Sequence, residues 1–160
     1  VLENSDEDFI PLTKEIELLE LYVKLEHNRF KDKFVYLIQI DENIDLESFS
    51  IPPMLLQPYI ENAIWHGLRY KEEKGDLLIS IAQRDVKTLL IVVQDNGIGR
   101  ARSKELKTKN QLKQKSKGIS TIENRISILN EMYKERISVS VQDLLENGEG
   151  TKVTMLLKKE

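Results

Sequence analysis

Three short stretches of the chain combine polar side chains and glycines at spacings that could bind a ligand. The first is 51–67, IPPMLLQPYIENAIWHG, in which Tyr59, Asn62 and His66 would share one face of a helix. Because Leu, Ile and Ala fill much of that helix, its polar groups need hydrogen-bonding partners. An ordinary amphipathic helix has the same pattern, so this stretch alone leaves both interpretations open.

The second stretch is 94–99, QDNGIG, at the end of an apolar strand. Asp-Asn-Gly is a common hairpin turn, but the residues that follow, Arg-Ala-Arg-Ser-Lys, do not resemble a returning strand. The spacing of Gly97 and Gly99 would let a flat ligand approach the backbone, and Asp95 could accept a hydrogen bond from an exocyclic amine. The third stretch, 148–151 (GEGT), taken alone is an ordinary turn.

Several other classes of site are excluded because their motifs are absent. The chain has no G-x-x-x-x-G-K-[ST] phosphate loop, no G-x-G-x-x-G after a strand and no G-x-S-x-G nucleophile elbow. Its two histidines, His27 and His66, are too far apart for a His-x-x-x-His zinc site. The absence of cysteine excludes disulfides and thiolate metal ligands.

Positive charge is concentrated in residues 100–117. Eight of these residues are Lys or Arg and one, Glu105, is acidic, so the segment carries +7 in a chain whose net charge is −3. A basic segment on an otherwise acidic protein indicates a polyanion nearby, although a solvated loop can have the same composition. The segment contains no aromatic residue, which argues against a nucleic-acid binder that stacks bases on aromatic rings.

Composition indicates a single soluble, globular unit. The chain has 160 residues, of which 40% are hydrophobic and 32% charged, which suits one domain with a real core. No apolar run approaches the roughly 20 residues of a membrane span, and no signal peptide is present. Because the first residue is Val1 rather than Met, we expect an excised piece of a longer protein, whose own membrane anchor stays an open question.

Periodicity predicts the elements that position these stretches. A helix capped by Thr13 should run to about residue 30 with a broad apolar stripe, whose members are Ile16, Leu18, Leu19, Tyr22, Val23, Leu25 and Phe30. Residues 34–40 alternate as a strand. Pro52 and Pro53 should open a second helix, which ends at Gly67 as its C′ residue.

The second half should consist mainly of paired strands. Strands 77–83 and 88–94 should form a hairpin, a third helix should cover 119–132, and strands 136–143 and 152–158 should flank the GEGT turn. These elements predict an α+β fold, a two-layer α/β sandwich in which one mixed, mostly antiparallel sheet is covered by helices on one face. We expect residues 1–160 to form one domain.

In this order, the stretches resemble the ATP-binding boxes of the gyrase, chaperone, histidine-kinase and MutL superfamily. Asn62 in ENAIWHG resembles the N box, DNGIG the first glycine box, Lys117-Gly118-Ile119 the second and Gly148-x-Gly150-Thr151 the third. Within that superfamily the phrases IPLTKEIELLELYVKLEHNRF and IPPMLLQPYIENAIWHG resemble the LytS-type sensor histidine kinases. The resemblance covers nearly the whole chain, from about residue 10 to residue 157.

The resemblance implies a set of contacts with ATP and Mg²⁺. Asp95 would accept a hydrogen bond from the adenine amino group, Gly97 and Gly99 would bring the backbone against the nucleotide, and Asn62 would give its amide oxygen to Mg²⁺. Segment 100–117 would be a mobile lid over the triphosphate. The remaining implied nucleotide contacts are His66, Arg69, Lys115, Lys117, Gly118, Ile119, Gly150 and Thr151.

The chain departs from the superfamily pattern at three positions. Trp65 stands where related kinases often have Lys or Arg, and Ser120 replaces the last glycine of the second glycine box. Pro58 stands where hydrolytic relatives have a water-activating Glu, which argues against a self-sufficient ATPase. Glu61 is then the remaining candidate for a catalytic base, although it lies about 100° round the helix from Asn62.

As implied by the resemblance, the chain would be the catalytic domain of a two-component sensor histidine kinase. The acceptor histidine would lie upstream of Val1 on a dimerising helical hairpin, with residues 1–12 the end of the linker, and His27 would be a surface residue. The parent would be a homodimer anchored in the bacterial inner membrane with this domain in the cytoplasm, a cognate response regulator and no direct nucleic-acid partner. The alternatives are a serine kinase or ATPase module of the same superfamily and, more distantly, a non-catalytic nucleic-acid-binding domain.

Overall fold

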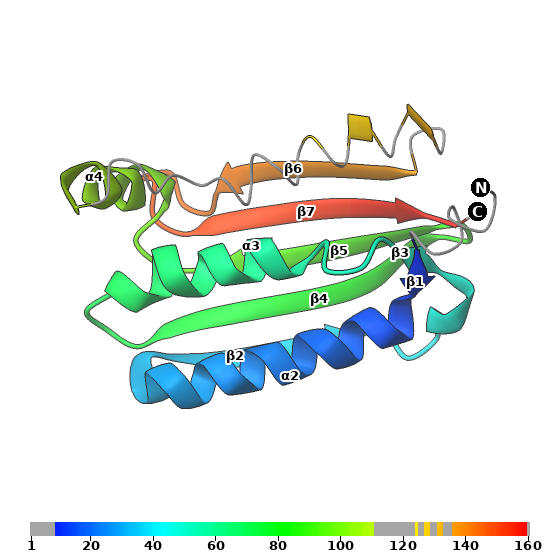
Figure 1. Ribbon diagram of the computed structural model, residues 1–160, viewed down its shortest axis with the longest axis horizontal. Helices are drawn as coiled ribbons and strands as arrows, with labels where there is room; N and C mark the ends of the chain where they lie inside the picture. The colour runs from blue at the N-terminus through cyan, green and yellow to red at the C-terminus, as the bar shows by residue number, and fades with distance from the viewer. Residues whose placement is uncertain (1–8, 111–123, 125–126, 129–130, 133–135, 160) are drawn as a thin grey trace.

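A five-stranded sheet with two helices packed on one of its faces makes up most of the structure (Figure 1). This computed structural model describes residues 9–110, 124, 127–128, 131–132 and 136–159. The sheet has the order β2-β4-β5-β7-β6. Its strands are β2 (Phe34–Ile40), β4 (Gly75–Asp85), β5 (Thr88–Asp95), β7 (Thr151–Lys158) and β6 (Ile137–Asp143).

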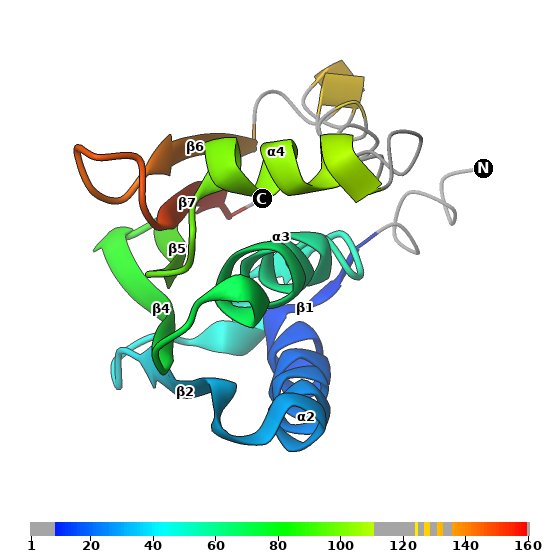
Figure 2. The same cartoon turned by 90° about the vertical axis from the view of Figure 1, so that its left-hand side faces the viewer.

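The sheet is mixed, as its sequence pattern predicts. β2 runs parallel to β4, and every other neighbouring pair is antiparallel. The parallel pair is joined by a helical crossover, whereas β4–β5 and β6–β7 are joined by short turns, because only antiparallel strands can be linked so tightly. In Figure 2 the strands lie to the left, with the helices α2 (Leu12–Phe30) and α3 (Gln57–Asn62) to their right. The predicted fold class, the five predicted strands within residues 34–158 and the hairpin of β4 with β5 are confirmed.

Helix α2 covers the sheet with only part of its apolar stripe. Ile16, Leu19 and Val23 are buried, but Leu18 and Leu25 are about half exposed, at 47% and 57%. The predicted cap is wrong, because the helix begins at Leu12, one residue before Thr13, and has no side-chain cap. Its start is fixed instead by pairing of β1 (Ile10–Pro11) with β3 (Ser50–Ile51), a small sheet that the sequence did not reveal.

The second helix begins later than predicted. Pro52 and Pro53 lie in a turn, and α3 starts at Gln57 with Pro58 in its first turn. It continues as a π-helical turn, η3 (Ala63–Gly67), and then as a 3-10 turn, η4 (Leu68–Tyr70). The predicted role of Gly67 as a left-handed C′ residue is wrong, since its φ is −113°.

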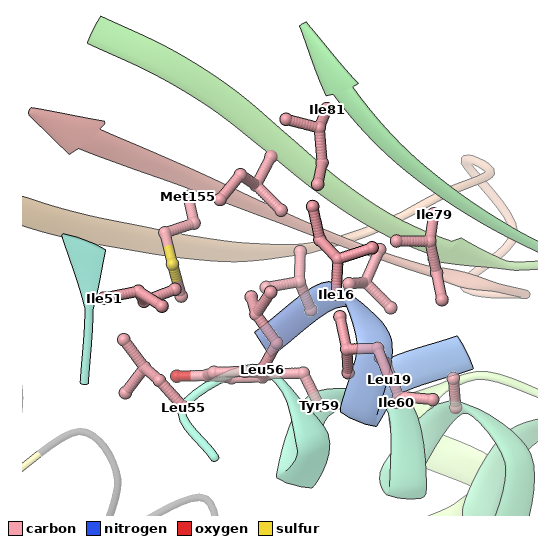
Figure 3. Packing of buried hydrophobic residues seen from close by; sticks show 14 of the residues in the cluster. Ile16, Leu19, Ile51, Leu55, Leu56, Tyr59, Ile60, Ile79, Ile81 and Met155 are labelled. Carbon is pink, nitrogen blue, oxygen red and sulfur yellow. The ribbon is translucent and has the colours of Figure 1, made fainter. Parts of the chain in front are cut away.

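The core lies between the sheet and the two helices (Figure 3). In Figure 3, Ile16 and Leu19 of α2 and Ile60 of α3 lie below Ile79 and Ile81 of β4. Tyr59 also belongs to this core, with 2% of its surface exposed, rather than to an exposed ligand-binding face. Burial of these side chains fixes how α3 lies on the sheet, and therefore where its remaining polar residues point.

After β5 the chain enters α4 (Arg100–Asn110), which begins the basic segment. The rest of that segment lies outside the described residues. So does most of the predicted third helix 119–132, although its described residues 124, 127–128 and 131–132 are helical. Among the described residues, no helix is both long and apolar enough to cross a membrane.

Candidate functional site

Asp95 ends β5 at the point where α3, β4 and the start of α4 come together. Only 3% of its surface is exposed. Its Oδ1 accepts a hydrogen bond from the Gly97 backbone nitrogen at 2.8 Å. Gly67, at the end of η3, lies directly against it, because a Cβ at that position would be 2.8 Å from Asp95 Oδ1. A glycine is therefore required there to give the carboxylate room.

This environment changes the acidity of Asp95. Burial raises the pKa of its carboxyl group to about 7, while the Gly97 N–H and the positive charge of Lys71 oppose that rise. A carboxyl group with a pKa near neutrality, buried beside glycines, is typical of a binding or catalytic site rather than of a structural ion pair.

The loop after Asp95 is held on two sides by the protein itself. Asn96 makes three hydrogen bonds with Asp76: its backbone N–H donates to Asp76 O (3.3 Å), its Nδ2 donates to Asp76 Oδ2 (3.0 Å), and its Oδ1 accepts from Asp76 N (2.7 Å). On the other side Gly97 O accepts from Gly150 N at 3.0 Å. The loop is thus fixed in place and does not form the hairpin that Asp-Asn-Gly can also indicate.

Both predicted glycines of this loop lie against backbone. A Cβ on Gly97 would be 2.3 Å from the carbonyl carbon of Gly67, and a Cβ on Gly99 would be 2.0 Å from Gly148 O. Gly99 also has a left-handed φ of +91°. The first and third glycine boxes are therefore packed against each other, and Thr151 lies directly opposite Asp95 in the β5–β7 ladder.

Asn62 lies at the end of α3, one residue before the π-helical turn. Its Nδ2 donates to Pro58 O at 2.9 Å, which fixes the orientation of the amide group and turns Oδ1 away from its own helix. Single π-helical turns often mark functional sites. No group of three or more His, Cys, Asp or Glu side chains that could hold a metal occurs in the described part of the chain. The Asn62 Oδ1 is an oxygen of the hard type that Mg²⁺ prefers as a ligand.

Trp65 faces α2. Its Nε1 donates to Glu26 Oε2, and its ring packs edge-on against Phe30 with centroids 5.0 Å apart. The guanidinium of Arg29 lies 5.4 Å from the ring centroid, and that of Arg69 lies 5.2 Å from it. The structure therefore places Arg69, a predicted nucleotide contact, on Trp65, with its guanidinium also 5.0 Å from the centroid of the Tyr70 ring.

Glu61 is exposed, on the side of α3 that faces Tyr22 of α2. The pKa of the Tyr22 hydroxyl is raised by burial and, in addition, by the carboxylates of Glu26 and Glu61. Its role as a base stays a prediction.

The remaining predicted residues are only partly described. His66 is half-buried in the π-helical turn beside Gly67. His27 is not a plain surface residue, because its ring packs edge-on against Phe34 and Tyr36, with centroids 5.3 Å apart in both pairs. Four predicted contacts and one departure lie outside the described residues: Lys115, Lys117, Gly118, Ile119 and Ser120.

Sequence reasoning missed several residues of this site. Lys71, whose charge acts on Asp95, follows η4 in a stretch that looked like a simple polar turn. Asp76 and Glu26 are acids of common types at unremarkable spacings, so their contacts with Asn96 and Trp65 appear only once the chain is folded. The sequence signal that could have indicated the Asp76 contact is Asn96, which lies inside the first glycine box.

Comparison with known proteins finds sequence similarity to bacterial sensor proteins and sensor histidine kinases. The sensor protein LytS of Oceanobacillus iheyensis is 40% identical over 99 residues, which are 61% of this chain and 16% of that protein. The sensor histidine kinase YpdA of Escherichia coli is 36% identical over 98 residues, 61% of this chain and 17% of that protein. Over these matched residues the chain is similar to the LytS-type sensor histidine kinases. No protein-family model matches it, and it spans about a sixth of the length of these two relatives.

Solved structures show that the chain has the same fold as the catalytic domains of histidine kinases. A mycobacterial sensor histidine kinase, MprB, superposes with a TM-score of 0.59 at 12% identity, covering 95% of this chain and 97% of that one. The catalytic domain of histidine kinase ThkA gives 0.59 at 14% identity, covering 94% of each chain. Full-length ShkA, solved in complex with AMPPNP, gives 0.62 at 18% identity over 95% of this chain and 32% of that one.

Proposed function

We propose that this domain binds ATP with Mg²⁺ and transfers the γ-phosphoryl group to a histidine on a separate segment of its parent protein. The observation that carries the proposal is the environment of Asp95: a buried carboxylate at the end of a strand, with Gly67 and Gly97 packed against it. Such a carboxylate can accept a hydrogen bond from an exocyclic amine, which adenine has at the position where guanine has a carbonyl oxygen.

The metal-binding end of the proposed site is Asn62. Because its Nδ2 donates to Pro58 O, the amide oxygen is the atom that would bind the metal. When bound, Mg²⁺ would bridge phosphate oxygens and offset negative charge. Arg69, His66, Thr151 and the lysines of the basic segment remain the proposed nucleotide contacts.

Pro58 favours transfer to a protein over hydrolysis. It stands one turn before Asn62, where hydrolytic relatives carry the acid that activates water, and its carbonyl oxygen is occupied by the Asn62 amide. Glu61 is the proposed base, and it is exposed enough to reach a group brought by a partner. We therefore propose slow ATP hydrolysis by the domain alone.

The partners follow from the same proposal. The acceptor would be a dimerising helical hairpin of the parent kinase, which would act as a homodimer and pass the phosphoryl group to a cognate response regulator. The parent would be held in the bacterial inner membrane with this domain on the cytoplasmic side. The basic segment would serve ATP rather than nucleic acid.

Incubation with radiolabelled ATP tests this function. The domain alone should stay unlabelled, because phosphoryl transfer requires an acceptor nitrogen held in line with the γ-phosphate. Addition of the parent's hairpin, in the same chain or as a separate dimer, should produce acid-labile phosphate on that hairpin. Stoichiometric phosphate on His66 or His27 of the isolated domain would show that the architecture is different.

A further inference from the structure

We infer that two buried glutamates of α2, Glu15 and Glu26, are positioning residues that hold the Asn62 helix at both ends. The two are called the glutamate pair below. Neither carries a catalytic or ligand-binding role in the proposed function, and both accept hydrogen bonds from the segment that carries Asn62. The inference rests on the proposed function, because it concerns the orientation of Asn62 toward a metal.

Glu15 holds the beginning of the Asn62 helix. It is only 1% exposed, and its two oxygens accept from the backbone nitrogens of Met54 (3.0 Å) and Leu56 (3.4 Å). Leu56 is the N-cap residue of α3, and the helix has no side-chain cap of its own. Met54 has a left-handed φ of +60°, a strained conformation for a residue with a side chain. Glu15 thus holds, from a different helix, the turn that leads into α3.

Glu26 holds the other end. It is 6% exposed, and its Oε2 accepts from Trp65 Nε1 and, at 3.5 Å, from the hydroxyl of Tyr22. Its Oε1 lies 3.6 Å from Arg29 Nε. Trp65 is three residues beyond Asn62, so the contact fixes the helix turn that follows the amide group.

The spacing of the glutamate pair matches this arrangement. Residues 11 apart in an α-helix lie about 16 Å apart along the axis and differ by only about 20° in direction, so both carboxylates face α3. Asn62 lies between the two contacts. A side chain that must present one oxygen to a metal gains from a helix fixed on both sides, because a displacement of about 1 Å is enough to lose a productive contact.

The arrangement also explains the departure at position 65. A Lys or Arg at this position would extend from the helix toward a ligand, whereas the indole N–H of Trp65 is directed into the protein at Glu26. In this domain the position therefore fixes the helix, and the positive charge nearest to it belongs to Arg29 and Arg69, which lie over the indole ring.

The test compares ATP affinity with Mg²⁺ and with EDTA, by calorimetry well below the unfolding temperature. The ratio of the two dissociation constants is the magnesium effect. Two variants weaken the contacts: Glu15→Gln leaves one acceptor for two N–H donors, and Trp65→Phe keeps a ring against Phe30 but removes the donor. Each should reduce the magnesium effect about tenfold, the equivalent of one charged hydrogen bond, and leave the affinity in EDTA unchanged.

Three further variants serve as controls. Glu26→Gln retains an oxygen that can accept from Trp65, so it should behave nearly as the wild type. Glu20→Gln makes the same chemical change at an exposed position of α2 and should have no effect. Val153→Ala removes buried volume in β7 and should lower the unfolding temperature without changing the magnesium effect.

The outcomes separate this inference from the proposed function. If the wild type shows no magnesium effect, the assignment of Asn62 fails and the inference falls with it. A second outcome is a wild-type magnesium effect that Asn62→Ala abolishes. If Glu15→Gln and Trp65→Phe then leave the effect intact, the glutamate pair only stabilises the fold and the inference is wrong. If Glu15→Gln fails to fold, the magnesium effect of Trp65→Phe is compared with that of Glu26→Gln, and a smaller effect in Trp65→Phe supports the inference.

Discussion

The two ends of the candidate site are built in different ways. At the Asp95 end, backbone lies against backbone: Gly97 packs on Gly67, Gly99 on Gly148, and Gly150 donates to Gly97. At the Asn62 end, one side chain on a helix is held by other side chains, through the contacts of α2 with Met54, Leu56 and Trp65. At the Asp95 end, Gly97 and Gly99 leave no room for a side chain. The Asn62 end depends instead on a few hydrogen bonds whose side chains can be substituted.

This difference changes the meaning of the glycine motif. The spacing of Gly97 and Gly99 suggests close approach by a ligand, but the structure shows that each glycine is first required by contact with another part of the chain. Because those contacts fix the loop around Asp95, a change at a glycine should affect stability and binding together. A change at Asn62 should affect binding alone.

Replacement of Gly97 by Ala should have the largest effect on stability. Its Cβ would be 2.3 Å from Gly67 C, so η3 and the loop must separate, which costs on the order of 1–3 kcal/mol for overpacking. We expect a lower free energy of unfolding in urea together with lost ATP affinity. Val153→Ala, a buried change in β7, should lower stability but keep ATP affinity. If Gly97→Ala also keeps ATP affinity, the glycine loop does not contribute to binding as described.

The second largest effect should be the pH dependence of the free energy of unfolding, and it should arise from Asp95. Burial raises the pKa of Asp95 from 3.8 to about 7, so the folded state holds this proton more tightly than the unfolded state does. Its stabilising contribution is complete below about pH 4 and is lost as the pH rises through 7. At about 1.4 kcal/mol per pH unit, the loss between pH 5 and 7 is about 2 kcal/mol.

Urea unfolding at pH 5, 6 and 7 measures this contribution. The wild type should lose stability relative to Asp95→Asn as the pH rises, because the amide does not titrate. Parallel curves for the two proteins across this range would mean that Asp95 is already ionised in the folded domain.

Asn62→Ala should have the smallest effect on stability and a selective effect on binding. The side chain is half-buried and makes one hydrogen bond within its own helix, so its removal should change the unfolding free energy by about 1 kcal/mol or less. ATP affinity in Mg²⁺ should fall, and affinity in EDTA should be unchanged. Calorimetry under both conditions checks the claim, and an equal loss in both would place the metal ligand elsewhere.

Much of the fold could be predicted from the sequence because its signals are local. The alternation in 34–40 predicted β2 to the residue, and Asp95-Asn96-Gly97 was recognised as the end of a strand. The start of α2 was missed because pairing of β1 with β3, residues far apart in sequence, fixes it rather than Thr13. The start of α3 was missed for a similar reason, since the turn that leads into it is held by Glu15 of another helix.

The site was predicted less completely than the fold. Asp95 and Asn62 were identified by motif, and the structure places one in a buried pocket and the other on the adjoining helix. Lys71 and Glu26 were not found, because ordinary charged residues acquire their roles only through contacts across the fold.

Titration of ATP into the wild-type domain and into Asp95→Asn, in Mg²⁺ and at fixed pH, tests the central claim most directly. Loss of one charged hydrogen bond is worth about 1.5–3 kcal/mol, so the wild type should bind ATP and the variant should bind it about 10- to 100-fold more weakly. The variant should remain folded by circular dichroism. Equal affinities, or no ATP binding by the wild type, would contradict the assignment of this pocket to adenine.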